Sequence, residues 1–475
     1  MQILRFTLEN HQSFRDEASI SLVDESLKTA TPPDGRSWVD YTRRVAAIYG
    51  PNASGKSALL DGLQFMRSVI QHSATRWSEN KRLPQRPFLL DENSRFRPST
   101  YMLDFVLEEV RYQYGFTFST SEIKEEWLYS YPTGRKRILF ERGIDGEDLK
   151  FGRALKGGEV MIDRLTGQRE LTLSRGAVSK NPQLKRIYDA IVEGMEIAEF
   201  GDANRQERLR RVTADVAEGA LEISDLLLML KVADIGIMSA EVATEEMPKG
   251  FQRVFQAILS IVRTEVASRR QDGDTSDDAD SIITKGPGGT YHQDAISEMS
   301  EDELQQISEQ LARALVFNHT GVDGNLYPLP SNRQSTGTLT WLSLAAPALS
   351  IIRRGGVLWI DEIDSSLHPQ LAQVLIQMFE NLEINRMGAQ IVFTTHDTYF
   401  MSPSAANPLK AQDIWLVEKG RDGASKLYSV ADFSLRSEQN FARRYLHGRY
   451  GAIPSVAPTF LAGIWHDDAP AEIEN

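Results

Sequence analysis

Residues 50–57, Gly-Pro-Asn-Ala-Ser-Gly-Lys-Ser, match the phosphate-binding pattern G-x-x-x-x-G-K-[ST] at every position. In such a loop, backbone N–H groups and the N-terminus of the following helix converge on a phosphate. Lys56 would reach the β- and γ-phosphates, and the Ser57 hydroxyl would take a Mg²⁺ position. The pattern predicts a site for ATP or GTP with Mg²⁺, and a Gly-rich turn with a surface lysine is the alternative. The predicted nucleotide-binding loop consists of Gly50, Pro51, Asn52, Ala53, Ser54, Gly55, Lys56 and Ser57.

The segments on either side of this loop have the patterns that a phosphate site needs. The apolar run 45–49 suits a buried strand. After Lys56, the apolar residues recur at helical spacing, so we expect a helix to begin at the loop. The residues of this apolar face are Leu59, Leu60, Leu63, Met66 and Ile70.

Two carboxylates follow a second apolar run, residues 356–360. In a Walker B arrangement, a strand delivers one acid to Mg²⁺ and the next to the attacking water, which assigns Asp361 to the metal and Glu362 to catalysis. The alternative is a pair of solvated acids at a strand end. A third apolar run, 391–395, ends at His396, which we expect to hydrogen-bond the γ-phosphate from the neighbouring strand end.

The segment Ser335-Thr336-Gly337-Thr338 opens a predicted helix over 339–349 and resembles a second anion site. Ser335, Gly337 and Thr338 would contact the γ-phosphate held by another copy of the chain, so that two heads sandwich two nucleotides. An ordinary capped helix is the alternative. Pro347 should bend this helix or end it early.

These motifs together resemble one protein group. The opening residues 1–14, the P-loop, the Ser-Thr-Gly-Thr segment, residues 361–369 (Asp-Glu-Ile-Asp-Ser-Ser-Leu-His-Pro), 393–397 (Phe-Thr-Thr-His-Asp) and the tail 444–454 look like the AbiL/RloA-type ATPases of bacterial phage-defence operons. The OLD proteins and the AriA component of the PARIS system look like cousins. The signature departs from the L-S-G-G-Q of ABC transporters, and no Q-loop glutamine is assigned; Gln85 is left out.

The resemblance implies a fold and further site residues. The fold would be α/β, an ABC/SMC-type P-loop ATPase head with a mixed sheet, flanking helices, an antiparallel β lobe and a helical insertion. It also adds Asp364 to the nucleotide-binding positions. The predicted parts are an N-terminal ATPase half over 1–178, a helical insertion over 179–318 and a C-terminal ATPase half over 319–475.

Composition narrows the class of protein further. The chain has 475 residues, 41% hydrophobic and 25% charged, as in a soluble globular protein. It lacks cysteine, which excludes disulfides, thiolate zinc sites and thiol nucleophiles. We expect a cytoplasmic protein with no membrane contact, because neither a signal peptide nor a long apolar stretch is present. The net charge of −13 argues against a surface dedicated to nucleic acid.

The pattern along the chain indicates strands first and helices in the middle. Strands are expected over 101–107, 110–118 and 136–140. Helical faces are expected over 184–195 and 251–262, but neither continues long enough for a coiled-coil arm. Residues 269–289 are polar and rich in glycine and aspartate, which predicts a mobile loop between helices. They depart from a calcium-binding loop at two key positions, so we reject a calcium site there.

Two basic clusters and one acidic strand end leave alternatives open. Residues 205–211 contain four arginines that could follow a nucleic-acid backbone, although a solvated helix face is the commoner outcome. The tail cluster Arg443, Arg444 and Arg449 is interleaved with tyrosines and could instead pack on the ATPase sheet. The strand 414–418 resembles the start of a Toprim nuclease, but too little chain follows for that domain.

The function expected from these features is an ATP-hydrolysing sensor or scaffold of an anti-phage (abortive infection) system. It would assemble as a homodimer or higher oligomer through ATP-sandwiched heads and control a separately encoded Toprim-like or RloB-type nuclease. The alternative is a RecF-like DNA-repair clamp without a toxic partner, for which direct nucleic-acid binding is expected. A nucleotide switch without turnover is a third possibility, and the presence of Glu362 weighs against it.

Overall fold

The computed structural model places the chain in two compact units, each discontinuous in sequence. One unit, here the P-loop unit, comprises 3–192 and 393–475; the other, the Walker B unit, comprises 1–2 and 193–392. The structure describes residues 1–453 except 25, 28, 30, 78–81, 145–147, 234–235, 245–283, 287–288, 292–312, 366 and 434–439. The expected helical face over 251–262 lies outside the described residues, as does most of the expected loop 269–289.

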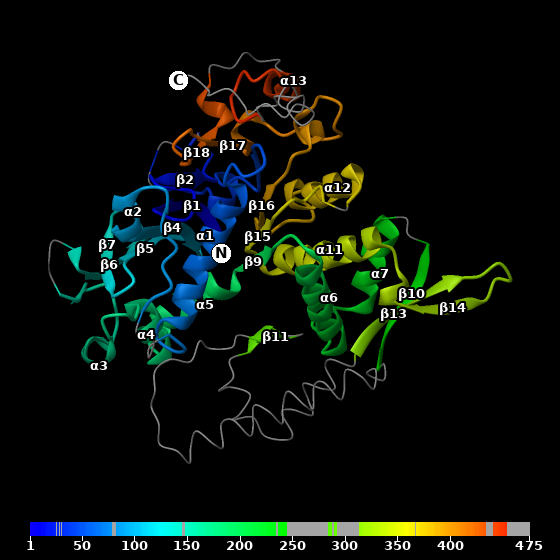
Figure 1. The fold of residues 1–475 in the computed structure, drawn as a ribbon. Coiled ribbons are helices and arrows are strands. Elements are labelled where there is room, and N and C mark those ends of the chain that lie inside the picture. Colours follow the sequence, from blue (N-terminus) through cyan, green and yellow to red (C-terminus); the bar gives the residue numbers. More distant parts are fainter. Residues whose placement is uncertain are drawn as a thin grey trace, which may run out of the picture. The chain divides into compact units, whose positions relative to one another are not determined.

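The P-loop unit contains a seven-stranded sheet with the order β2-β1-β4-β5-β6-β7-β8 (Figure 1). Every pair whose register is given is antiparallel, from β1·β2 to β7·β8. This is the predicted antiparallel β lobe. Its strands are β1 (Gln2–Glu9), β2 (Ala18–Ser21), β4 (Ser99–Leu107), β5 (Val110–Phe118), β6 (Ile123–Tyr131), β7 (Arg137–Arg142) and β8 (Lys150–Phe151).

A second group of strands carries the P-loop. β3 (Val45–Tyr49) is buried along its whole length, and it pairs in parallel with β17 (Ile414–Lys419), which in turn pairs antiparallel with β18 (Ser425–Ser429). The acidic strand resembling a Toprim domain is therefore part of the ATPase sheet. The helices of this unit are α1 (Lys56–His72), α2 (Glu92–Phe96), α3 (Glu159–Leu165), α4 (Thr172–Val178), α5 (Pro182–Glu193) and α13 (Phe441–Leu446).

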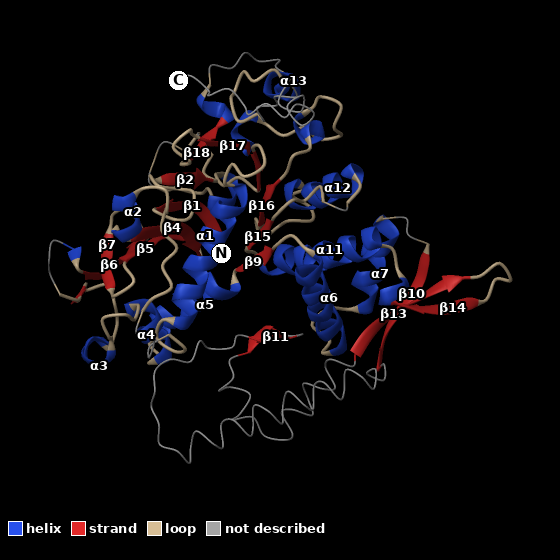
Figure 2. Cartoon of the chain, in the orientation of Figure 1, coloured by secondary structure: helices blue, strands red, loops and turns tan. Residues whose placement is uncertain are grey.

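The Walker B unit combines parallel strands with helices and a β hairpin (Figure 2). β15 (Val357–Ile360) pairs in parallel with β9 (Met195–Ala198), and β16 (Gln390–Thr394) begins with its first amide bonded to the Gly356 carbonyl. β10 (Ile237–Thr244), β13 (Arg313–Thr320) and β14 (Leu326–Pro330) form an antiparallel sheet, and β11 (Thr284–Gly286) pairs with β12 (Gly289–Tyr291). The helices are α6 (Asp202–Ala217), α7 (Ile223–Val232), α11 (Thr336–Arg354) and α12 (Pro369–Glu380).

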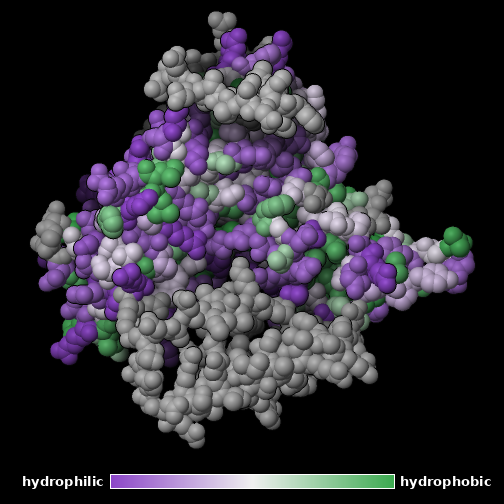
Figure 3. Space-filling view, in the orientation of Figure 1, coloured by the Kyte–Doolittle hydropathy of each residue, from purple (hydrophilic) through white to green (hydrophobic). Residues whose placement is uncertain are grey.

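The core of the Walker B unit joins α6, α7, α11 and the sheet of β10 and β13. Its apolar contacts include Val212 on α6, Leu226 on α7, Phe317 on β13 and Leu342 on α11. The hairpin loop between β13 and β14 extends from this core, and its residue Val322 is fully exposed. Most of the hairpin surface at the right of Figure 3 is hydrophilic, with a small hydrophobic spot at the tip. Helix α6 packs on α11, the helix whose first turn carries the predicted anion site.

Several predicted elements form where expected. Strands 101–107, 110–118 and 136–140 correspond to β4, β5 and β7, and the helix after Lys56 is α1. The face over 184–195 ends early, because Met195 belongs to β9 rather than to α5. Pro347 does not end its helix: α11 continues to Arg354, so that part of the prediction is wrong.

The tyrosines of the tail cluster pack against the P-loop unit, which is the second of the two alternatives given for this cluster. Tyr445 is buried, its hydroxyl donates to the Ala452 carbonyl at 2.9 Å, and its ring lies 5.9 Å from that of Tyr49 on β3. Tyr428 donates to the Tyr450 carbonyl at 2.8 Å. The tyrosines of the cluster therefore stabilise the fold.

Candidate functional site

The P-loop connects β3 to α1 in the manner that the sequence predicts. Gly55 immediately precedes the first residue of α1 and has a left-handed backbone with φ of 115°. The side chain of Lys56 is buried, and its Nζ donates to the carbonyl oxygens of Gly50 and Pro51 at 2.8 and 3.2 Å. The lysine is thus held inside the loop, with Ser57 exposed beside it on the first turn of α1. This arrangement fits the polyphosphate of a nucleotide.

Two serines from distant parts of the chain support this loop. Ser425 on β18 donates its hydroxyl to the Ser54 carbonyl at 2.5 Å and lies 2.8 Å from the Ser13 hydroxyl. The Ser425 amide also donates to the Ser13 carbonyl at 2.7 Å. The buried Ser54 hydroxyl has no hydrogen-bond partner in the described part of the chain. The hydrogen bonds of Ser425, to Ser54 and to Ser13, therefore stabilise the loop conformation, as a preformed phosphate site requires.

Replacing Gly55 with alanine should disrupt this arrangement. A Cβ at Gly55 would lie 2.5 Å from Ser425 Oγ and 2.7 Å from Ser13 Oγ, and the backbone is left-handed. We expect a loss of about 1–3 kcal/mol in the free energy of unfolding, together with loss of nucleotide binding. Urea unfolding and a fluorescent nucleotide titration measure the two effects.

Gly35→Ala is the matched control. Gly35 has φ of 77° and no atom within 4 Å of the position of a Cβ, so it carries the backbone cost without the collision. We expect Gly35→Ala to bind nucleotide normally. Equal effects of the two substitutions on nucleotide binding would contradict the proposed support by Ser13 and Ser425.

A buried polar network anchors α1 to the β lobe. His11 is fully buried, and its Nε2 and Nδ1 lie 2.9 Å from Asp61 Oδ2 and 2.6 Å from the Tyr101 hydroxyl. Gln12 donates to the same Asp61 carboxylate at 2.6 Å, and Arg86 pairs with it as well. Burial raises the pKa of Asp61, but the hydrogen bonds from His11 and Arg86 outweigh this and leave the pKa below its usual value.

Asp61→Asn should therefore destabilise the P-loop unit in a pH-dependent manner. The folded-state pKa of Asp61 is depressed, so its contribution is complete above the unfolded pKa of about 3.9 and is lost as the pH falls through the folded value. We expect a cost of about 1–3 kcal/mol at pH 7 for charged hydrogen bonds of this kind. Urea unfolding at pH 7 and pH 3 measures it. A wild-type-to-variant difference that is as large at pH 3 as at pH 7 would refute this role.

His396 lies where the sequence places it, just beyond β16. The Thr395 amide donates to the Ile48 carbonyl at 3.1 Å, which sets the end of β16 beside the end of β3. The Tyr49 hydroxyl donates to the Asp397 carbonyl at 3.1 Å. His396 lies between these two anchored residues and is exposed, at the end of the strand beside β3.

The Walker B carboxylates follow a fully buried strand in their own unit. The Asp361 amide donates to the Ala198 carbonyl at 2.9 Å, which extends the β9–β15 pairing by one residue. Glu362 has a left-handed backbone with φ of 53°, unusual for glutamate. Both side chains are partly exposed, and Asp364 lies in the turn that follows.

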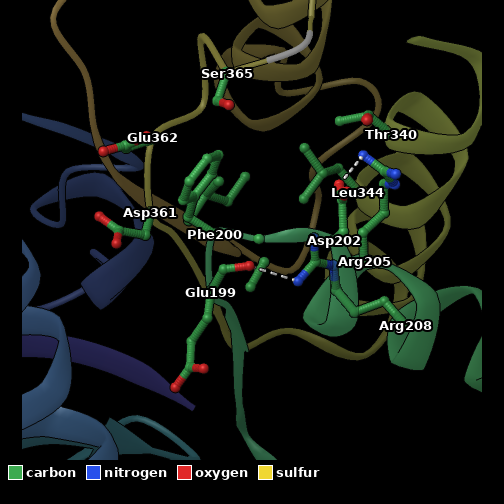
Figure 4. Close-up of a pocket in the computed structure, with 13 residues that line it drawn as sticks. Glu199, Phe200, Asp202, Arg205, Arg208, Thr340, Leu344, Asp361, Glu362 and Ser365 are labelled. Carbon is green, nitrogen blue, oxygen red and sulfur yellow. Dashed lines mark hydrogen bonds and ion pairs between the residues drawn. The ribbon is translucent and has the colours of Figure 1, made fainter. Parts of the chain in front are cut away.

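A cavity of about 340 Å³ opens beside these carboxylates (Figure 4). Its wall includes Asp361, Glu362 and Ser365 from the Walker B segment, and Phe200 from the loop between β9 and α6. In Figure 4 the carboxylates of Asp361 and Glu362 lie on one side and the arginines of α6 on the other. Acidic side chains predominate, so this wall suits a cation such as Mg²⁺ better than an anion.

The N-terminus of α11 carries the predicted signature residues. Ser335 caps the helix: its Oγ accepts from the Thr338 amide at 3.1 Å and lies 2.8 Å from Thr338 Oγ1. Ser335 is exposed and Gly337 partly exposed, whereas Thr338 is buried. The Ser335 side chain therefore acts as the N-cap of α11, as expected for an ordinary capped helix. The first turn of α11 remains a predicted anion site.

The predicted site residues fall into two groups. The P-loop and His396 belong to the P-loop unit, whereas Ser335, Gly337, Thr338, Asp361, Glu362 and Asp364 belong to the Walker B unit. In the described part of the chain, no group of three histidine or carboxylate side chains could hold a metal alone. A Mg²⁺ ion held by fewer protein side chains would need phosphate oxygens to complete its coordination. Gln85 donates to the Arg97 carbonyl and lies 3.0 Å from Ser99 Oγ, a structural role.

Sequence reasoning missed the residues that support the loop. Ser13 belongs to the opening motif that carried the family resemblance, and that was the available signal. Ser425 lies in a short strand with no motif around it. No helix in the described residues is both long and apolar enough to cross a membrane.

Comparison with known families places the chain in a class. Residues 45–402 match the family described as AAA domain, putative AbiEii toxin, Type IV TA system. The match covers well over half of the chain and spans the P-loop, both Walker B carboxylates and His396. The chain therefore belongs to this family of P-loop ATPase domains. No curated protein matches the sequence.

Among solved structures, the chain is similar to SMC heads. The SMC head domain from Thermotoga maritima is 14% identical, with 90% of this chain and 99% of that chain covered and a TM-score of 0.36. An Smc head with an extended coiled coil, bound to the C-terminal domain of ScpA derived from Pyrococcus furiosus, is 14% identical, with coverage of 90% and 96% and a TM-score of 0.37. The structure itself has the predicted mixed α/β fold with an antiparallel lobe.

Proposed function

We propose that the chain binds and hydrolyses ATP with Mg²⁺ as the sensor or scaffold of an anti-phage system. The observation that carries the ATPase part is the preformed P-loop, with Lys56 held inside it and the exposed Ser57 on the first turn of α1. Membership of the AAA family described above supports the same assignment. The family description names a putative toxin of a toxin–antitoxin system, which supports a defence role and the AbiL/RloA-type resemblance.

In this proposal each site residue has one task. Lys56 and His396 would contact the γ-phosphate, Lys56 offsetting its charge, and Ser57 and Asp361 would hold Mg²⁺. Glu362 orients the attacking water and accepts its proton. Ser335, Gly337 and Thr338 close the site of a second copy from the first turn of α11, and Asp364 is a further nucleotide-binding position. Bound Mg²⁺ would offset the charge that develops on the transferred phosphoryl group.

The wider organisation is part of the same proposal. ATP would join two or more copies through their heads in the cytoplasm, and the assembly would control a separately encoded Toprim-like or RloB-type nuclease. The proposed domain organisation is an N-terminal ATPase half over 1–178, a helical insertion over 179–318 and a C-terminal ATPase half over 319–475. The DNA-clamp alternative is less favoured, because Arg208 of the basic helix is buried rather than presented to a nucleic-acid backbone.

The test combines turnover with capture of partners. Purified protein should release phosphate from ATP in a Mg²⁺-dependent manner, and products of neighbouring genes should co-purify with it in the presence of ATP. Absence of both turnover and partner would refute the proposal. Turnover with ATP-stimulated, salt-sensitive DNA binding and no partner would instead support the DNA-clamp function.

A further inference from the structure

A second cavity lies in the Walker B unit; it shares Arg208 with the first cavity, but neither Asp361 nor Glu362 lines it. Its volume is about 570 Å³, and it lies between α6 and the C-terminal half of α11. One side is apolar, with Val212, Leu221, Ala346 and Pro347. Cavities of this size hold ligands as large as a nucleotide.

Arginines dominate the polar side of this cavity. Arg208 and Arg211 come from α6, and Arg353 and Arg354 from the last turn of α11, against the carboxylates of Glu196 and Asp215. In the Walker B cavity the balance is reversed, with two arginines against four carboxylates. The second cavity is therefore the one suited to an anion, in a chain whose net charge is −13.

Arg208 is the least satisfied of these cations. The residue is only 9% exposed, and its Nη1 donates to the Glu199 carbonyl at 2.8 Å (Figure 4). Its Nε is buried without a partner, and among the described residues no carboxylate lies within ion-pair distance of it. Burial lowers the pKa of Arg208 to about 10, which still leaves the guanidinium charged at neutral pH. The charges of Glu196 and Glu199 favour the cation through space, but no direct ion pair neutralises this buried guanidinium.

The other arginines differ in how firmly they are held. Arg353 forms two bonds of 2.6 Å with Asp225 and so belongs to the fold. Arg211 makes long, exposed contacts of 3.3 and 3.4 Å with Glu196 and Glu207. Arg354 is exposed and forms no ion pair with any described residue. Arg211 and Arg354 can therefore turn toward an entering anion, while Arg208 lies deeper in the wall.

We propose that this cavity binds a small phosphate-bearing ligand of nucleotide size, separate from the P-loop site. Guanidinium groups match phosphate oxygens with paired N–H donors, so Arg208, Arg211 and Arg354 would hold the phosphates. The wall of Val212, Leu221 and Pro347 would contact the remainder of the ligand. Because the cavity adjoins both α6 and the signature helix α11, occupation would stabilise their packing.

The test separates this site from the P-loop by using Lys56→Ala as the background. Isothermal titration without Mg²⁺ would measure binding of pyrophosphate, which probes the arginines alone, and of AMP, which also probes the apolar wall. We expect both to bind in this background. Adding Arg211→Gln and Arg354→Gln should weaken binding about tenfold or more, since each removes charge-assisted hydrogen bonds.

Arg210→Gln is the matched control, because Arg210 is an exposed neighbour on α6 that does not line the cavity. Its binding should equal that of the background. The proposal is overturned if neither probe binds, or if the double substitution binds as tightly as Arg210→Gln. It is also overturned if only a single-stranded oligonucleotide binds to these arginines, since that would make the surface a nucleic-acid contact. None of these results depends on ATP turnover, so the proposed function is tested independently.

Discussion

Glu362→Gln should reduce ATP turnover by about a hundredfold or more while leaving ATP binding intact, because the amide can neither accept the proton of the attacking water nor orient it as a base. The substitution removes one charge and keeps the shape of a side chain that is partly exposed at the end of β15. Turnover would be measured by phosphate release under saturating ATP and Mg²⁺. Binding would be measured with a fluorescent nucleotide.

The same variant should accumulate the ATP-bound assembly. Mass photometry of Glu362→Gln should show a stable dimer or larger species with ATP and Mg²⁺, and monomer without them. Glu383→Gln is the matched control, because Glu383 is exposed in the same unit and lies outside the candidate site. If Glu362→Gln hydrolyses ATP as fast as Glu383→Gln does, Glu362 is not the catalytic base.

Lys56→Ala should weaken ATP binding by about a hundredfold or more, since a charge-assisted contact to the phosphates is lost. The substitution also leaves the Gly50 and Pro51 carbonyls without their lysine donor. We therefore expect a lower free energy of unfolding in addition to the lost affinity. A nucleotide titration and urea unfolding separate the two effects.

Lys231→Ala provides the comparison for this result, since Lys231 is an exposed lysine at the end of α7. It should bind ATP as the wild type does. If Lys56→Ala binds ATP as well as Lys231→Ala, the P-loop does not hold the nucleotide and the proposed function fails.

The sequence predicted those parts of the site that depend on local patterns. The strand 45–49, the loop and α1 are contiguous, so hydrophobic periodicity and glycine spacing were enough to place them. The same holds for β15 with its carboxylates and for β16 with His396. The prediction that Pro347 ends its helix was wrong, because the packing of α11 on α6 outweighs the hydrogen bond that one proline removes.

The supporting residues could not be found in this way. Ser425 and Ser13 are 412 residues apart and meet through strand pairing, which no local period encodes. Arg208 was grouped with a basic helix face, yet the fold buries it while Arg210 and Arg211 stay exposed. Its burial depends on how α6 packs on α11, a long-range property.

The left-handed backbone of Glu362 has a consequence for how this position can change during evolution. A non-glycine residue in that conformation costs about 1–2 kcal/mol relative to the right-handed region. Glycine or asparagine would relieve this cost, so if Glu362 is the catalytic base proposed above, the most stable sequence and the active sequence differ at this one residue. In a lineage that no longer needs turnover, selection would cease to hold the glutamate, and the position would drift toward glycine or asparagine. In related proteins, the residue at the position of Glu362 would then distinguish those that hydrolyse ATP from those that have lost this activity.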